Sequence, residues 1–103
     1  MTTPNATLRA TVSFTRYDQG THAGRWTIVG RKGQVRPKLE STARHGGTPW
    51  TVTLGERPIE GGTVKTVFVE VPWRLSSQSL TDEEIARIID LAREQVGEFT
   101  VID

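Results

Sequence analysis

The sequence predicts an α+β domain in which a four- to five-stranded antiparallel sheet is followed by one C-terminal amphipathic helix packed on one face. Two patterns predict this fold class. Before residue 74, several short segments alternate apolar and polar residues, which is typical of half-buried strands. After residue 81, apolar residues recur at spacings of three and four, which is typical of a helix. The chain has 103 residues and no low-complexity linker, so we expect a single domain over residues 1–103.

The first three expected strands occupy residues 8–15, 25–30 and 35–39. In the first of them, the even-numbered apolar residues from Leu8 to Phe14 alternate with polar ones. Residues 17–24 have the composition of a turn or loop, so the first two strands should form a hairpin. A tight connection with glycines at both ends, residues 30–33, should form the tip of a second hairpin between the second strand and the third. Pro37 has no backbone N–H to donate to a ladder, so the third strand is expected at an edge of the sheet.

Two further strands are expected over residues 50–54 and 63–73, each preceded by a loop, at 40–49 and 55–62. The last strand is the most apolar segment of the chain. Val67, Val69 and Val71 fall on one side of it, and Val64 and Phe68 fall on the other. Apolar residues on both sides indicate a central strand.

The C-terminal helix has the clearest local signals. Thr81 and Glu84 form a T-x-x-E capping box, so the helix should begin at about Asp82. Three acidic residues fall in its first turn, where they complement the helix dipole, and Gly97 stands where a C-cap is wanted. Residues 98–103 are expected to add a short terminal strand or a tail. The apolar stripe that should face the sheet consists of Ile85, Ile88, Ile89, Ala92 and Val96.

Composition excludes several kinds of site. The chain has no cysteine, which removes disulfides, thiolate nucleophiles and cysteine zinc sites together. No apolar run approaches the roughly 20 residues that span a bilayer, and residues 1–10 lack the layout of a signal peptide. We therefore expect a cytoplasmic protein with no membrane partner.

The two halves of the chain carry opposite charge. Residues 1–58 have nine basic side chains against three acidic ones, a net of +6, and residues 59–103 have four against nine, a net of −5. The basic half could attract a polyanion. Exposed Lys and Arg also keep sheet edges from pairing, so the same charge is equally compatible with a structural role.

No catalytic or metal-binding signature stands in the sequence. His22 and His45 lie in glycine-containing loops 23 residues apart, without the spacing of a metal site, even if Asp18 is added as a third ligand. The serines form no nucleophile elbow, and the glycines form neither a phosphate-binding loop nor a dinucleotide fingerprint. We therefore expect a protein that is not an enzyme and holds no cofactor or metal.

The stretch GRKGQVRPK, residues 30–38, concentrates basic residues beside glycines and a proline. Single-stranded nucleic acid is bound by a cationic groove combined with aromatic platforms. Trp26 and Trp50 could stack bases, but both are in phase with apolar neighbours, as core tryptophans usually are, so either role is open. The residues expected to bind nucleic acid are Tyr17, Arg25, Arg31, Lys32, Arg36, Lys38 and Arg44.

The leading hypothesis is a small nucleic-acid-binding module that prefers single strands and uses a basic sheet face and a hairpin tip. In its order of sheet and then helix the chain resembles the Whirly single-stranded nucleic-acid binders, although no motif matches residue by residue. The alternative is a protein-interaction or inhibitor domain, of a kind found in phages and mobile elements, that acts through its acidic helix or an edge strand. One helix of about 24 Å cannot cover both faces of a sheet, so we also expect a homodimer.

Overall fold

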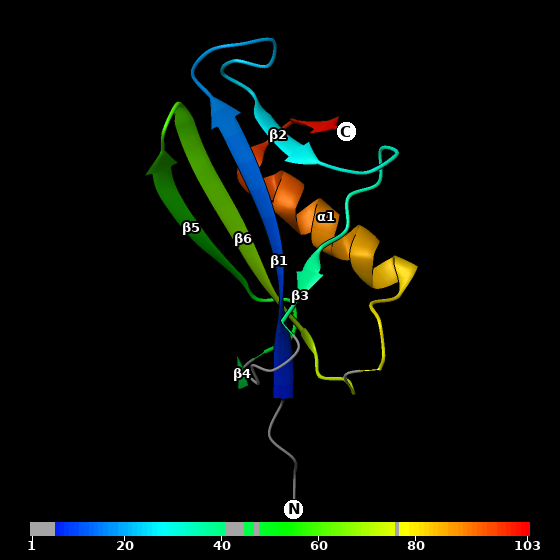
Figure 1. The fold of residues 1–103 in the computed structure, drawn as a ribbon. Coiled ribbons are helices and arrows are strands. Elements are labelled where there is room, and N and C mark those ends of the chain that lie inside the picture. The colour runs from blue at the N-terminus through cyan, green and yellow to red at the C-terminus, as the bar shows by residue number, and fades with distance from the viewer. Residues whose placement is uncertain (1–5, 41–44, 47, 76) are drawn as a thin grey trace, which may run out of the picture.

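The computed structural model describes residues 6–40, 45–46, 48–75 and 77–103. One sheet lies beside one helix, which confirms the α+β class with a C-terminal helix (Figure 1). No helix in the described residues is long and apolar enough to cross a membrane. The elements follow in the order β1 (Ala6–Tyr17), β2 (Trp26–Val29), β3 (Lys38–Leu39), β4 (His45–Gly46), β5 (Val52–Ile59), β6 (Gly62–Pro72), α1 (Asp82–Val96) and β7 (Phe99–Ile102).

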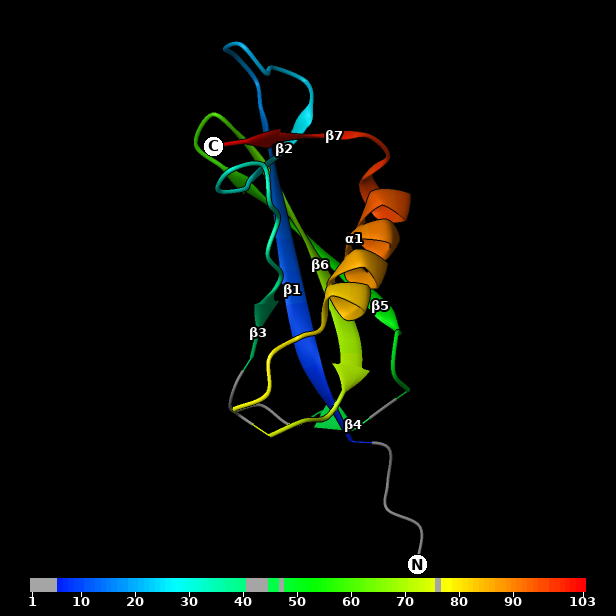
Figure 2. The same ribbon diagram turned by 90° about the vertical axis from the view of Figure 1, so that its right-hand side faces the viewer.

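The sheet is larger than expected and is mixed. Within the described residues it has seven strands, five of which lie side by side in the order β5-β6-β1-β2-β7. The short strands β3 and β4 also pair with β1, along the edge that β2 uses. β7 confirms the terminal strand, but it runs parallel to β2 (Figure 2). The chain turns after α1 so that Phe99, the first residue of β7, lies beside Trp26, the first residue of β2. The prediction of a purely antiparallel sheet of four to five strands is therefore wrong in number and in direction.

Strands β1 and β6 form the long central pair, in register from Thr7 opposite Pro72 to Tyr17 opposite Gly62. β6 lies between β1 and β5, which confirms the central strand predicted from its two apolar sides. The predicted loop at 55–62 is wrong, because most of it belongs to β5 and to the start of β6. The sequence pattern did not identify this part of β5, because charged residues and proline are depleted in strands in general. The same residues are tolerated on an exposed edge strand such as β5.

Glycines permit the tight connection between β5 and β6. The turn has only two residues, Glu60 and Gly61, and Gly61 has a φ of 80°, a value that favours glycine. Gly62 then opens β6 directly against β1. A Cβ at Gly62 would lie 2.3 Å from the Arg16 carbonyl oxygen, so only glycine fits there.

The turn at residues 30–33 is as tight as predicted, but the hairpin around it does not form. Lys32 and Gly33 have φ values of 56° and 75°, the pair of positive values found in type I′ turns. Beyond the turn, β2 and β3 do not pair with each other. Both pair with β1, one after the other along the same edge.

Tertiary packing explains this outcome. Val35 and Leu39 pack against the core, which draws the segment after the turn towards β1 and away from β2. The predicted loop at 40–49 is interrupted by β4, which pairs with β1 at Ala6 and Thr7. The strand predicted over 35–39 is present only as the two residues of β3, and β4 has no periodic pattern that a sequence could show.

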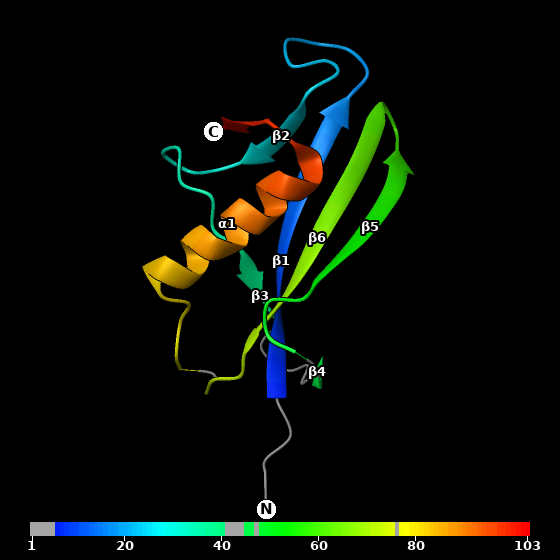
Figure 3. The ribbon, with the colours of Figure 1, turned by 180° about the vertical axis from the view of Figure 1, so that it is seen from behind.

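The core lies between the sheet and α1, which covers one side of the sheet (Figures 2 and 3). The capping box predicted at Thr81 is present, and Ile88 and Ala92 are the fully buried members of the predicted helix stripe. Ile85, Ile89 and Val96 are half-buried at its margins. The buried apolar residues are Leu8, Ala10, Val12, Phe14, Trp26, Ile28, Val67, Val69, Val71, Ile88 and Ala92.

An arginine clamp holds the start of α1 to the end of β6. Arg74 Nη1 donates to Glu84 Oε1 at 2.6 Å, and the guanidinium also donates to the carbonyl oxygens of Pro72 and Ser79. The Thr81 N–H donates to the same Glu84 carboxylate at 2.9 Å. The hydrogen bond from Arg74, supported by the bond from Thr81, lowers the pKa of Glu84 to about 2. Glu84 is therefore a structural residue and not part of a free acidic surface.

The side of the sheet away from α1 is largely polar, and we call it the open face. Register places the odd-numbered residues of β1 on it, most of which bear hydroxyl groups. On the central pair of strands the apolar exceptions are Val64 and Phe68, both half-buried, and the Arg9 guanidinium lies 5.1 Å from the Phe68 ring centre. The prediction of a homodimer rests on the sheet face that one helix leaves uncovered, and the open face is that face. Its hydroxyl-bearing residues on the described strands include Thr7, Thr11, Ser13, Thr15, Thr27, Thr53, Thr66 and Thr100.

Candidate nucleic-acid interface

The structure distributes the predicted binding residues over three places. Tyr17 ends β1 with 42% of its surface exposed, and Arg36 and Lys38 stand at the start of β3. These three residues line one hollow on the open face. The other residues do not reach it: Arg31 and Lys32 are exposed on the turn at 30–33, Arg25 lies at the start of β2 beside a different hollow, and Arg44 falls outside the described residues.

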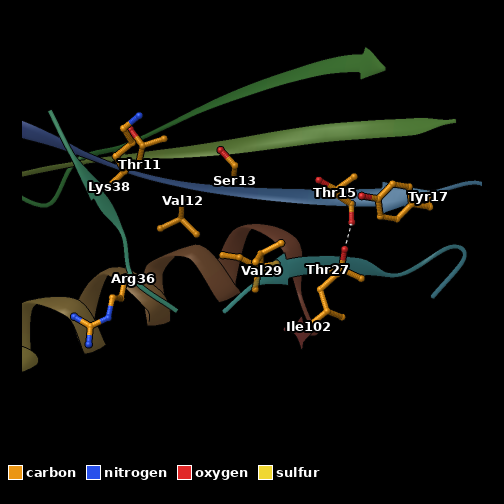
Figure 4. A pocket seen from close by; sticks show the side chains of 11 residues that line it. Thr11, Val12, Ser13, Thr15, Tyr17, Thr27, Val29, Arg36, Lys38 and Ile102 are labelled. Carbon is orange, nitrogen blue, oxygen red and sulfur yellow. Dashed lines mark hydrogen bonds between the residues drawn. The ribbon is translucent and has the colours of Figure 1, made fainter. Parts of the chain in front are cut away.

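The hollow lies alongside β1 and has a volume of about 370 Å³ (Figure 4). That volume is at the lower end of the range of small-molecule pockets, about 300–1,000 Å³. Its wall combines hydroxyl groups, two cationic side chains, one phenol and a few apolar groups. The lining residues are Thr11, Val12, Ser13, Thr15, Tyr17, Thr27, Ile28, Val29, Arg36, Lys38 and Ile102.

A break in the sheet creates the hollow. On this edge of β1, β3 pairs with residues 10 and 11 and β2 pairs with residues 15 and 16. No described strand is in register with residues 12–14 on this side, although β6 pairs with all three on the other. The hollow is therefore the space between the start of β3 and the end of β2.

Figure 4 shows how the side chains around this gap divide. Thr11, Ser13 and Lys38 lie on one side of the β1 ribbon and Val12 lies on the other, as the alternation of a strand requires. The Thr27 hydroxyl donates to the Thr15 carbonyl oxygen at 2.8 Å and closes one end of the gap. Ser13 is exposed in the middle.

The charges of the open face are mainly positive. Lys38 and Arg57 are exposed on it, and Arg9 is 3.4 Å from Glu70 in an ion pair. The Arg36 guanidinium stands at the margin of the hollow, 3.3 Å from the Gln34 side-chain oxygen. The helix, with its exposed carboxylates, lies on the other side of the sheet (Figure 2).

Neither Trp26 nor Trp50, the two tryptophans considered as stacking surfaces, is free to stack a base on the open face. Trp26 is buried in the core, with the Arg16 guanidinium 4.6 Å from its ring centre. Trp50 is half-buried on the helix side, and the Arg87 guanidinium lies 4.1 Å from its ring. Trp50 also has a φ of 73°, a strained value for a bulky residue, in a turn where the Thr51 N–H faces the Thr48 carbonyl oxygen. Both rings are thus assigned to packing.

The histidines form no metal site within the described residues, which contain no group of three or more His, Asp or Glu side chains that could hold an ion. His22 is half-buried in the loop between β1 and β2. The backbone of His45 belongs to β4, which pairs with the first residues of β1. The two residues therefore lie near opposite ends of β1.

Sequence reasoning missed the hydroxyl row of β1 and its partner Thr27. The signal available was the run of hydroxyl-bearing residues at the odd-numbered positions Thr11, Ser13 and Thr15, which by itself indicates only the polar side of a half-buried strand. The gap beside Ser13 has no signal in the sequence, because it depends on where β2 and β3 end along β1.

No protein-family model, curated protein or solved structure matches this chain, so the site has to be interpreted from its own geometry.

Proposed function

We propose that the protein is a cytoplasmic nucleic-acid-binding module, without enzymatic activity, that takes single strands across the open face. The observation that carries the proposal is the convergence of Tyr17, Arg36 and Lys38 on one hollow from two separate segments of the chain. A phenol and two cations beside hydroxyl groups supply what single-strand binding needs: a stacking surface, positive charge for phosphates and hydrogen-bond partners.

Salt dependence is the first test, by fluorescence anisotropy with labelled single-stranded and duplex oligonucleotides at two salt concentrations. Phosphate contacts release counterions, so the affinity should fall steeply as salt rises. Sequence preference should be slight. If no binding is detected at low salt, where even non-specific attraction is strongest, the proposal is wrong.

Two matched double variants locate the contacts. R36Q/K38Q and R31Q/K32Q each remove two positive charges, the first pair at the hollow and the second on the exposed turn. A site at the hollow predicts that R36Q/K38Q loses more affinity than R31Q/K32Q. Equal losses would indicate a diffuse electrostatic attraction, and the larger loss in R31Q/K32Q would move the contacts to the turn. Neither variant should lower the melting temperature, because exposed charges contribute little to folding.

Tyr17→Ala distinguishes stacking from charge. Tyr17 is the exposed aromatic residue at the hollow, and a stacked base contributes about 1–3 kcal/mol. We expect the variant to bind single strands about 5- to 150-fold more weakly while duplex binding changes little, because only unpaired bases offer their faces. Tyr17→Phe is the control and should retain affinity, since it keeps the ring.

One observation favours a second function, protein interaction through the free edge of β5. The Glu70 N–H donates to the Thr51 carbonyl oxygen, so the even-numbered peptide groups of β6 face β5. It follows from the register that Val52, Leu54 and Glu56 turn their own peptide groups outward. Leu54 is 47% exposed at this edge.

A second copy of the chain is the partner we propose for this edge. Antiparallel pairing with Leu54 opposite its own counterpart would join two apolar side chains and keep the two Glu56 carboxylates apart. Light scattering should then report twice the 11.4 kDa of one chain, and Leu54→Lys should give a monomer. Val29→Lys, at a residue 73% exposed away from β5, is the control. A monomer at every concentration would remove the homodimer.

A further inference from the structure

The backbone of Ser13 is directed into the hollow with both of its hydrogen-bonding groups. The carbonyl oxygens of Arg9 and Tyr17 accept bonds from Glu40 and Gly24, which lie on the edge of β1 away from β6. Residues two apart in a strand point their peptide groups the same way, so those of Ser13 point to this edge too. The ladder break leaves no described strand in register with Ser13 there.

We propose that the Ser13 N–H and C=O bind the Watson–Crick edge of one unpaired nucleobase. This inference rests on the proposed function and names the group that occupies its site. Each of the four bases carries a hydrogen-bond donor next to an acceptor on that edge, and the Ser13 N–H and C=O offer the complementary donor and acceptor side by side. In a duplex those edges are already paired. The contact therefore selects single strands and discriminates little between bases.

The surroundings of Ser13 favour a nucleotide over an added peptide strand. An augmenting peptide needs several consecutive residues of free edge, whereas the gap covers residues 12–14 and is closed by β3 on one side and β2 on the other. Lys38 pairs with Thr11, about 7 Å along β1 from Ser13, where it can meet a phosphate. Tyr17 lies about 14 Å away in the other direction, far enough to stack a different base of the same strand.

Three 8-mer probes separate base contacts from phosphate contacts: oligothymidylate, oligodeoxyadenylate and an abasic oligomer with the same phosphates. Ser13→Pro removes the N–H and costs no bond to β6, because this N–H faces the gap. Ser13→Ala is the matched control, since it removes the hydroxyl and keeps the N–H. We expect Ser13→Pro to bind both base-bearing oligomers about 3- to 10-fold more weakly than Ser13→Ala, and both variants to bind the abasic oligomer alike.

Amide NMR on the unaltered protein gives a readout that does not depend on the folding of Ser13→Pro. The Ser13 amide resonance should shift with oligothymidylate and not with the abasic oligomer. If the oligomers bind but the Ser13 amide does not respond, or the two variants bind alike, the inference is wrong and the proposed function stands. If no oligomer binds, both fail. A Ser13 shift that follows protein concentration and not oligomer would assign the gap to a second copy of the chain and overturn the inference.

Discussion

Replacing Glu84 with Gln removes one negative charge from the arginine clamp while keeping the shape of the side chain. The carbonyl oxygen of the new amide can still accept from the Thr81 N–H, so the change isolates the bond to Arg74. A hydrogen bond to a charged group contributes about 1.5–3 kcal/mol to stability. The Arg74 and Glu84 side chains are 10% and 18% exposed, so we expect only modest screening and a loss of about 1–3 kcal/mol at pH 7.

The pH dependence follows from the direction of the pKa shift. The Arg74 bond lowers the pKa of Glu84 in the folded chain from 4.5 to about 2, so between these values the unfolded chain binds the extra proton. The clamp therefore stabilises the fold fully above pH 4.5, and this contribution is lost as the pH falls towards 2. The difference between the wild-type chain and Glu84→Gln should shrink over the same interval.

Urea unfolding followed by circular dichroism at about pH 7, 5, 3.5 and 2.5 measures this difference. Glu83→Gln is the control, because Glu83 is an exposed carboxylate in the same helical turn, and it should change stability little at any pH. Each kcal/mol lost should also lower the melting temperature by about 4–8 °C in a domain of this size. If Glu84→Gln and the wild-type chain lose stability in parallel down to the lowest pH, the clamp does not hold the helix and the reasoning is refuted.

Two further substitutions test the packing. Ile88→Ala, at a fully buried helix residue, should cost about 2–5 kcal/mol in denaturant unfolding, and an unchanged midpoint would contradict the placement of α1 on the sheet. Gly62→Ala should prevent or strongly weaken folding, since the new Cβ would meet the Arg16 carbonyl oxygen. Gly20→Ala is the control: Gly20 lies in open space at a φ of 106°, so the change should cost only the strain of that backbone conformation, about 1 kcal/mol. Similar losses of stability at the two glycines would argue against the close approach of β6 to β1.

Elements whose signals are local could be predicted from the sequence. The helix is one, because its capping box, acidic first turn and C-terminal glycine lie within or beside its own residues, and the structure has it over Asp82–Val96 as expected. The alternating strand β1 and the apolar strand β6 are two others. The same locality explains the correct turn at Lys32 and Gly33, where glycine supplies a positive φ that few other residues tolerate.

Elements that depend on a distant partner could not be predicted. β4 has two residues, too few for any periodicity, and it forms because it pairs with the first residues of β1. The strand expected over 35–39 was identified, but its shortening to the two residues of β3 depends on where it meets β1. The strand character of Glu56, Arg57 and Pro58 is likewise visible only once β6 lies beside them. The direction of β7 depends on where the helix ends relative to β2, which no short pattern contains.

The candidate site could be predicted only in part, for the same reason. A run of basic residues over 30–38 appears as one surface in the sequence, but the turn at 30–33 sends Arg31 and Lys32 away from the place that Arg36 and Lys38 occupy. Tyr17 joins the latter two because β3 pairs with β1, a tertiary event. A variant that removes all four charges therefore mixes two surfaces and cannot show which of them binds. Only the matched pairs, together with a probe of the Ser13 backbone, test the geometry itself, because that geometry is a property of the strand register and not of the composition.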